Sequence, residues 1–190
     1  MAKKGKLFII SAPSGSGKTT LCGRLIKSAR GMARSVSMTT RPPRQGEKSG
    51  KDYIFVTKKE FEKYIKSNSL LEWVRNFGYY YGTPKDKVLK LLAKGKNVIL
   101  AIDVKGAMKI KRLRPESVLI FIVPPSIAEL KKRLKRRKAD SRGEISGRIK
   151  IAKRELSYLP RYTYSVVNND IEEAAGKLKA IIIAERHRVK

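Results

Sequence analysis

The 190-residue sequence has little of what several protein classes require. It holds a single cysteine, Cys22, so no disulfide framework can form within the chain, and a reducing compartment is the simpler expectation. We expect Cys22 to be a small core residue. The only histidine, His187, lies in a charged stretch near the C-terminus, where a solvated surface residue is more common than a catalyst. A mechanism for this chain must therefore work without histidine.

Long apolar runs are also missing. The first run, Leu7 to Ile10, is too short for a signal peptide or a membrane span, although a basic N-terminus precedes it. We therefore expect a cytoplasmic protein that does not associate with membranes. The length suits one core domain with a small inserted subdomain.

Acidic residues are scarce, since 16 Asp and Glu stand against 45 Lys and Arg, for a formal net charge of +29. Such an excess projects a positive potential over much of the surface and favours anionic partners. For any single lysine, a solvated helix face is the commoner interpretation. The chain shows no motif that reads nucleic acid, so specific nucleic-acid binding is not expected. Weak, non-specific adhesion to RNA stays open as an alternative.

Apolar runs alternate with amphipathic segments along the chain. Buried strands are expected at Leu7 to Ser11, Asn97 to Asp103, Val118 to Val123 and Tyr164 to Val167. Helices are expected from Thr19, Pro84, Ser126, Glu144 and Ile171. The alternation predicts an α/β fold, in which a parallel sheet carries helices on both faces.

The stretch from Ser35 to Gly82 has a different residue pattern, with aromatic runs separated by Gly and Pro. This pattern predicts a small, mostly β insertion. A polar stretch, Lys138 to Gly147, lies between two Arg-rich segments and indicates a mobile flap. The expected division is a core (1–34, 84–125 and 160–190), an insertion (35–83) and a helical lid with its flanking helices (126–159).

The most specific signal is the segment Ala12-Pro-Ser-Gly-Ser-Gly-Lys-Thr-Thr20, between the first expected strand and the first expected helix. It matches a phosphate-binding loop, except that Ala12 replaces the usual glycine. In such a loop, backbone N–H groups surround phosphate oxygens and Lys18 adds a positive charge. Thr19 supplies a hydroxyl that can hold Mg²⁺. The alternative, a Gly/Ser-rich turn with a chance lysine, fits the flanking strand and helix poorly.

Two carboxylates stand out elsewhere, and each has two interpretations. Asp103 follows an apolar strand, where it can lie near a metal and phosphates or simply start a turn or cap a helix. Glu72 lies between apolar Leu71 and Trp73, and this alternation alone predicts that its side chain faces solvent. If Glu72 instead faces a pocket, it needs donors, and guanine offers two adjacent ones, N1–H and N2–H₂.

Arg41 and Arg44 are held apart by two prolines, a suitable clamp for a phosphate dianion, to which Tyr53 and Tyr81 could add hydroxyl donors. The alternative is that these side chains only cover the strands of the insertion.

Together these residues resemble guanylate kinase, a family of phosphate-loop nucleoside monophosphate kinases, from Leu7 to about Ile183. The strings that carry the resemblance are Ser11 to Thr20, Ser35 to Arg44, Gly50 to Tyr53, Leu71 to Trp73, Tyr80 to Pro84, Ile102-Asp103 with Gly106-Ala107, Pro124 to Ser126, and Val166 to Asp170.

The resemblance implies an enzyme that transfers the γ-phosphoryl group of ATP to GMP or dGMP with Mg²⁺ as cofactor, acting as a monomer or homodimer. It implies an ATP-binding core, a GMP-binding insertion and a lid. ATP-binding residues would be Ala12, Pro13, Ser14, Gly15, Ser16, Gly17, Lys18, Thr19, Thr20, Arg133, Arg137 and Asn168, the last near adenine, with Thr19 at the metal. Guanine would contact Ser37, Glu72, Thr83 and Asp103, and the GMP phosphate would contact Arg41, Arg44, Tyr53 and Tyr81. Catalytic roles would fall to Lys18, Arg41, Arg137 and Arg148.

Two positions depart from the family pattern. Ala101 stands where an acidic residue is usual, which removes a carboxylate near the expected Mg²⁺. Arg136-Arg137-Lys138 replaces the usual Gly-Arg-Gly in the lid. The rival from another class is a non-catalytic interaction module of guanylate-kinase-like fold. Such modules tend to lose the phosphate loop and the lid arginines, both of which are present here.

Overall fold

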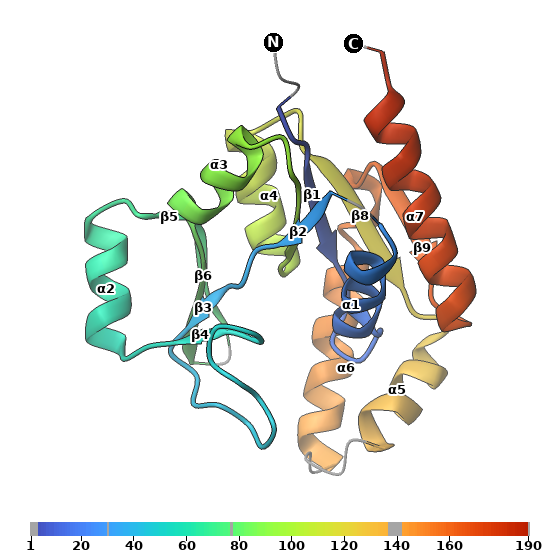
Figure 1. Cartoon of the computed structure of the whole chain (residues 1–190). Helices are drawn as coiled ribbons and strands as arrows, with labels where there is room; N and C mark the ends of the chain where they lie inside the picture. The colour runs from blue at the N-terminus through green and yellow to red at the C-terminus, as the bar shows by residue number, and fades with distance from the viewer. Residues whose placement is uncertain (1–3, 30, 77, 137–141, 190) are drawn as a thin grey trace.

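A computed structural model describes residues 4–29, 31–76, 78–136 and 142–189 of the chain (Figure 1). The strands are β1 (Leu7–Ser11), β2 (Met32–Arg34), β3 (Met38–Thr39), β4 (Ile54–Phe55), β5 (Leu70–Asn76), β6 (Tyr79–Pro84), β7 (Asn97–Ala101), β8 (Val118–Val123) and β9 (Tyr164–Val167). The helices are α1 (Lys18–Ser28), α2 (Lys58–Lys66), α3 (Lys85–Ala93), α4 (Val104–Leu113), α5 (Ile127–Arg136), α6 (Arg142–Leu156) and α7 (Ile171–His187), with a 3₁₀ turn at Leu159–Arg161.

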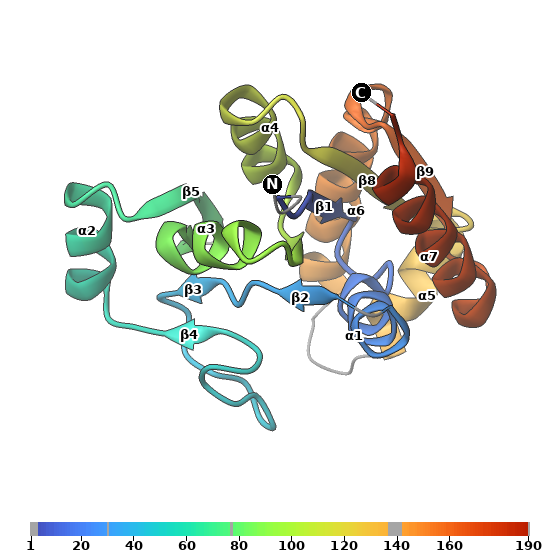
Figure 2. The same ribbon diagram turned by 45° about the horizontal axis from the view of Figure 1, so that its top comes forward.

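The larger sheet has five strands in the order β2-β7-β1-β8-β9, and all of its pairings are parallel. Central β1 is buried along its whole length, because parallel strands with helices on both faces see no water. One face packs against α1 and α7, and the opposite face packs against α3 and α4 (Figure 2). The predicted α/β fold with helices on both faces is confirmed, and Cys22 lies fully buried in this core.

The smaller sheet has four strands in the order β4-β3-β6-β5 and lies beside the larger one, with α2 at its outer side (Figure 1). Antiparallel β5 and β6 form most of it. Helix α2 covers it through Phe61, which is fully buried and stacks on Tyr80 with the ring centroids 5.3 Å apart. The insertion is therefore mostly β as expected, but it also contains a helix that we did not predict. Its start shows a capping box between Thr57 and Glu60.

Several element boundaries differ from the expected ones for local reasons. Strand β7 ends at Ala101 rather than Asp103, because the Asp103 side chain caps the start of α4 and accepts from the Gly106 N–H at 2.8 Å. In the described part of the expected flap, residues 142–147 belong to α6, and Ile145 is buried. Residues 138–141 lie outside the described ranges.

Helices α5 and α6 form a pair held by buried Leu130, Leu134 and Ala152. This pair places one end of α6 beside the loop that follows β1 (Figure 1). In the described part of the chain, no helix combines the length and the apolarity needed to cross a membrane.

Candidate active site

The loop between β1 and α1 is shaped by two glycines with positive φ angles, Gly15 at 93° and Gly17 at 86°. Only glycine adopts this conformation without strain. A Cβ atom at Gly17 would lie 2.4 Å from Asn168 Nδ2, so the position excludes any side chain on steric grounds as well. Asn168 is buried and donates from Nδ2 to the Ser16 carbonyl at 2.7 Å. The end of β9 thus holds the loop in a curved form, which matches the predicted phosphate-binding loop.

Lys18 reaches from the start of α1 across to the neighbouring strand end, where its Nζ donates to the Ile102 carbonyl at 2.9 Å. Burial lowers the pKa of Lys18, and the nearby Asp103 carboxylate partly opposes that effect. The ammonium group therefore lies at the mouth of the loop, where an anion could replace the carbonyl as its partner.

A cleft of about 660 Å³ opens between this loop, the smaller sheet and α6. It brings together most of the residues singled out from the sequence, namely Ala12, Pro13, Ser14, Gly15, Gly17, Lys18, Thr19, Thr20, Ser37, Arg41, Arg44, Tyr53, Glu72, Tyr81, Asp103 and Arg148.

Four other predicted residues do not line the cleft. Ser16 and Asn168 bond to each other at the back of the loop, and Thr83 contacts the cleft only through Glu72. Arg133 is engaged along its own helix, where its Nε donates to Glu129 Oε1 at 3.1 Å. Arg137 lies outside the described residues.

The arginine clamp already holds an anion from its own chain. Arg41 Nη2 donates to both carboxylate oxygens of Glu47 at 2.9 Å, and the Arg44 backbone N–H donates to Glu47 Oε2 at 2.8 Å. The Arg41 guanidinium also lies 5.5 Å from the Tyr53 ring centroid. Sequence analysis missed Glu47, whose spacing from Arg41 and Arg44 was the available signal. The arrangement shows that this loop can wrap a small oxyanion.

Glu72 is buried at 5% exposure, so the outward-facing interpretation is wrong. Strand β5 is the edge strand of the smaller sheet beside β6, and it also packs against α4, so that Leu70, Leu71 and Glu72 are all buried. Glu72 Oε1 accepts from Thr83 Oγ1 at 2.7 Å, while Oε2 has no hydrogen-bond partner. Burial raises the pKa of Glu72 to about 7, an effect that Thr83 opposes and Asp103 reinforces.

Asp103 combines both of the roles left open for it. It caps α4, so the helix-cap interpretation is confirmed, and it also lines the cleft near Lys18. Its second oxygen accepts from Asn76 Nδ2 at 3.4 Å. The carboxylates of Asp103 and Glu72 thus belong to the same end of the cleft, where their electrostatic interaction is felt.

Glu155 on α6 also lines the cleft, although no pattern in the sequence points to it. Burial raises its pKa to about 7, and the neighbouring Lys18 opposes that rise. No motif surrounds Glu155, and only the packing of α6 brings it to the phosphate loop.

The described residues contain no group of three or more His, Cys, Asp or Glu side chains arranged to hold a metal ion. Such a cage is not what Mg²⁺ requires, since this ion commonly takes one or two protein oxygens, substrate phosphates and several waters. The exposed Thr19 hydroxyl at the start of α1 and the Asp103 and Glu155 carboxylates all line the cleft. These oxygen donors fit a nucleotide-bound Mg²⁺.

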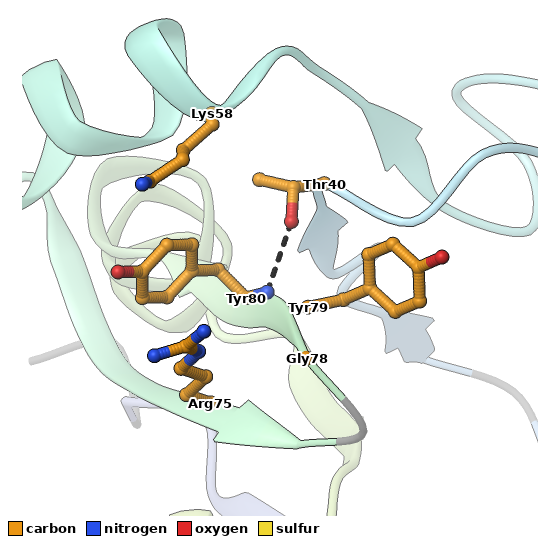
Figure 3. Close-up of a pocket in the computed structure, with 6 residues that line it drawn as sticks. All are labelled: Thr40, Lys58, Arg75, Gly78, Tyr79 and Tyr80. Carbon is orange, nitrogen blue, oxygen red and sulfur yellow. Dashed lines mark hydrogen bonds between the residues drawn. The ribbon is translucent and has the colours of Figure 1, made fainter.

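A second hollow of about 330 Å³ is lined by Thr40, Lys58, Arg75, Gly78, Tyr79 and Tyr80 (Figure 3). Its Arg75 guanidinium lies 6.0 Å from the Tyr80 ring centroid, and Thr40 Oγ1 accepts from the Tyr80 N–H at 2.9 Å. It has neither a carboxylate nor a residue of the phosphate loop. The larger cleft is therefore the candidate active site.

Comparison with known proteins agrees with this geometry. The family model described as guanylate kinase matches residues 4–185. Guanylate kinase from Caldanaerobacter subterraneus is 48% identical over 98% of this chain and 91% of its own, and that from Clostridium tetani is 46% identical over 98% and 89%. The crystal structure of guanylate kinase from Anaplasma phagocytophilum superposes with a TM-score of 0.84 at 34% identity, covering 98% of this chain and 89% of that one.

Proposed function

Because the chain belongs to the guanylate kinase family, we propose that its cleft transfers the γ-phosphoryl group of ATP to GMP and to dGMP, which carries the same base and phosphate. The enzyme is a nucleoside monophosphate kinase. The observation that carries the assignment of the site is that the phosphate loop and the buried Glu72 carboxylate open into one cleft.

The ATP phosphates would lie in the loop from Ala12 to Thr20. Its backbone N–H groups and the N-terminus of α1 supply partial positive charge, and Lys18 supplies a full one. On binding, a phosphate oxygen would take the place of the Ile102 carbonyl as the partner of Lys18 Nζ.

The GMP base would lie at the other end of the cleft. Glu72 presents a buried carboxylate whose Oε1 is already fixed by Thr83, and guanine N1–H and N2–H₂ are donors that a carboxylate can accept side by side. Adenine has an unprotonated N1 at that place and would leave the carboxylate unpaired, which costs binding energy. The base selectivity would therefore follow from Glu72, supported by Ser37 and Asp103.

The GMP phosphate would replace Glu47 on the arginine clamp. Arg41 Nη2 now donates to both oxygens of a carboxylate, and a phosphate dianion offers oxygens of similar spacing with more charge. Tyr53 and Tyr81, whose rings lie edge to face with centroids 6.1 Å apart, would donate from their hydroxyls.

Mg²⁺ would be held by Thr19, by ATP oxygens and by water, and it neutralises charge on the phosphates when bound. Ala101 lines the same cleft and offers no carboxylate. Asp103 and Glu155 are the cleft carboxylates whose charges act on Lys18, and they could hold the waters of the ion.

The nucleophile would be an oxygen of the GMP phosphate, which is largely ionised at neutral pH because the second pKa of a phosphate monoester is near ~6. It attacks the γ-phosphorus, the bond to the bridging oxygen breaks, and ADP leaves with that oxygen. No general base is needed. Lys18, Arg41 and Arg148 would hold the two phosphates in line and share the charge, with Arg133 and Arg137 as contributions from the lid.

The test is ADP release from ATP and Mg²⁺ with GMP, dGMP, AMP, CMP and UMP as acceptors. We expect turnover with the two guanine nucleotides and little with the others. Lys18→Ala should lower turnover by orders of magnitude, whereas Lys177→Ala should not, since Lys177 is exposed on α7 and pairs with Glu173. Equal use of AMP, or near-normal turnover of Lys18→Ala, would contradict the assignment.

The non-catalytic interaction module is separated by the same experiment, because such a module would neither bind ATP nor release ADP. We further propose a cytoplasmic enzyme that is a monomer or a homodimer, which light scattering decides. The net charge of +29 supports at most weak adhesion to RNA beside the kinase activity. Full activity together with an absence of RNA binding at physiological salt would dismiss that adhesion.

A further inference from the structure

Gly106 lies buried in the first turn of α4, directly against the Glu72 side chain. A Cβ atom placed on Gly106 would lie 2.7 Å from Glu72 Oε2 and 3.2 Å from Glu72 Cδ. Real Cβ atoms do not make contacts as short as the first of these. The Glu72 carboxylate therefore occupies space that any other residue at position 106 would fill.

The backbone does not require glycine at this position. The φ angle of Gly106 lies outside the left-handed region, and the hydrogen bond of its N–H to Asp103 is one that any non-proline residue can make. Glycine within a helix is also unfavourable relative to alanine. The absence of a side chain at 106 thus works against the stability of α4.

Gly82 is a glycine required by core packing, and its surroundings differ from those of Gly106. A Cβ atom there would meet Phe61 Cζ at 2.9 Å, Leu70 Cδ1 at 3.0 Å and the Glu72 carbonyl oxygen at 3.2 Å, all parts of the closed core of the smaller sheet. At Gly106 the two nearest atoms instead belong to the end of the flexible Glu72 side chain, and Ile102 Cδ1 follows at 3.3 Å. An alanine at 106 would be accommodated by moving the carboxylate, with α4 and β5 staying together.

We propose that Gly106 is a positioning residue for guanine specificity. Because it has no side chain, the Glu72 carboxylate can occupy the position from which it accepts hydrogen bonds from the base. This inference rests on the proposed function, and it adds Gly106 to Glu72 as a residue that determines the selectivity for guanine. To regain an ordinary contact, Glu72 Oε2 would have to retreat from 2.7 Å to at least 3.4 Å from the new methyl group. Such a shift misaligns both the bond from Thr83 and the paired acceptors for guanine.

The experiment compares Gly106→Ala with Gly176→Ala, a helical glycine on α7 whose Cβ would meet nothing within 4 Å. We expect Gly106→Ala to raise KM for GMP on the order of tenfold or more, as for the loss of a hydrogen bond to a charged group. KM for ATP and the melting temperature should stay close to those of the unmodified enzyme. Gly176→Ala should leave both KM values unchanged and raise the melting temperature slightly, since alanine is more favourable than glycine inside a helix.

IMP is the discriminating substrate, because it keeps N1–H but lacks the exocyclic amine. Misalignment of the carboxylate should lower the ratio of kcat/KM for GMP to that for IMP, and a general packing defect would not. In a Glu72→Ala background the added effect of Gly106→Ala should vanish, since no carboxylate remains to be displaced.

An unchanged KM for GMP and an unchanged GMP/IMP ratio in Gly106→Ala would overturn the inference. So would a large fall in melting temperature with both nucleotide KM values raised, which would make Gly106 a packing residue like Gly82. Failure of the unmodified enzyme to use GMP is a separate result, and it would count against the proposed function itself.

Discussion

Replacing Glu72 with glutamine should have opposite effects on stability and on activity. Burial raises the pKa of Glu72 from 4.5 to about 7. Below pH 4.5 the carboxyl is protonated in the folded and the unfolded chain alike. Between these two values the unfolded chain releases the proton while the folded chain retains it, so the free energy of unfolding falls as the pH rises through the folded pKa. The contribution present at low pH is thus lost above about pH 7.

The size of this loss follows from the pKa difference. A shift from 4.5 to about 7, at 1.36 kcal/mol per unit, corresponds to about 3 kcal/mol. Glutamine keeps a carbonyl acceptor for Thr83 and cannot ionise. The difference in unfolding free energy between Glu72→Gln and the unmodified protein should therefore grow by about 3 kcal/mol, in favour of the variant, from pH 4.5 to about pH 8.

Urea unfolding at several pH values measures this difference directly. Glu155, whose pKa is also raised by burial, is present in both proteins, so its own contribution cancels. Glu116→Gln is the matched control, because Glu116 has a side-chain exposure of 68% and should show no such growth. Parallel pH profiles for Glu72→Gln and the unmodified protein would refute the reasoning about burial.

The same variant should lose activity toward GMP. One of the two acceptors that face guanine becomes an amide donor, and hydrogen bonds to charged groups are worth about 1.5–3 kcal/mol. The expected fall in kcat/KM for GMP is about 10-fold to 100-fold, with KM for ATP little changed. A variant that is both more stable at high pH and less active would identify Glu72 as a residue kept for function at a cost in stability.

Three further predictions concern the two phosphate sites. Gly17→Ala, with a φ of 86° and a Cβ 2.4 Å from Asn168 Nδ2, should greatly raise KM for ATP, while Gly23→Ala on α1, with nothing within 4 Å, should not. Arg41→Lys should raise KM for GMP about tenfold, because a lysine ammonium lacks the planar fork with which Arg41 now contacts both Glu47 and the Pro42 carbonyl; an unchanged KM would remove Arg41 from the clamp. Chelation with EDTA should abolish ADP release and added Mg²⁺ should restore it, and turnover that persists without a divalent ion would contradict the assigned cofactor.

Sequence alone could predict the elements whose signal is local. Apolar runs gave β1, β8 and β9 with the bounds that the structure shows, although only Val166 of β9 is buried, and the glycine pattern predicted the tight loop between β1 and α1. The helices α2 and α4 were missed although each starts with a capping residue, Thr57 and Asp103. Their signals competed with other interpretations, since α2 lies inside a β-rich stretch and Asp103 was taken as the end of a strand.

The remaining features depend on contacts between distant segments. The alternation around Glu72 predicted an exposed side chain, because a period of two assumes one dry face, whereas α4 closes the second face of β5. Glu155 becomes a cleft residue only through the packing of α6. Glu47 is near Arg41 in the sequence, but the choice between a bond to arginine and a solvated carboxylate depends on the folded loop.

The bond from Asn168 to Ser16 joins positions separated by 152 residues. The loop near the start of the chain is therefore braced by a strand that leaves the ribosome late in synthesis. A nascent chain that has exposed its glycine-rich segment but not yet β9 lacks this brace and the outermost strand of the larger sheet. The curved form of the loop is thereby tied to the placement of β9, because its own segment alone does not supply this bond.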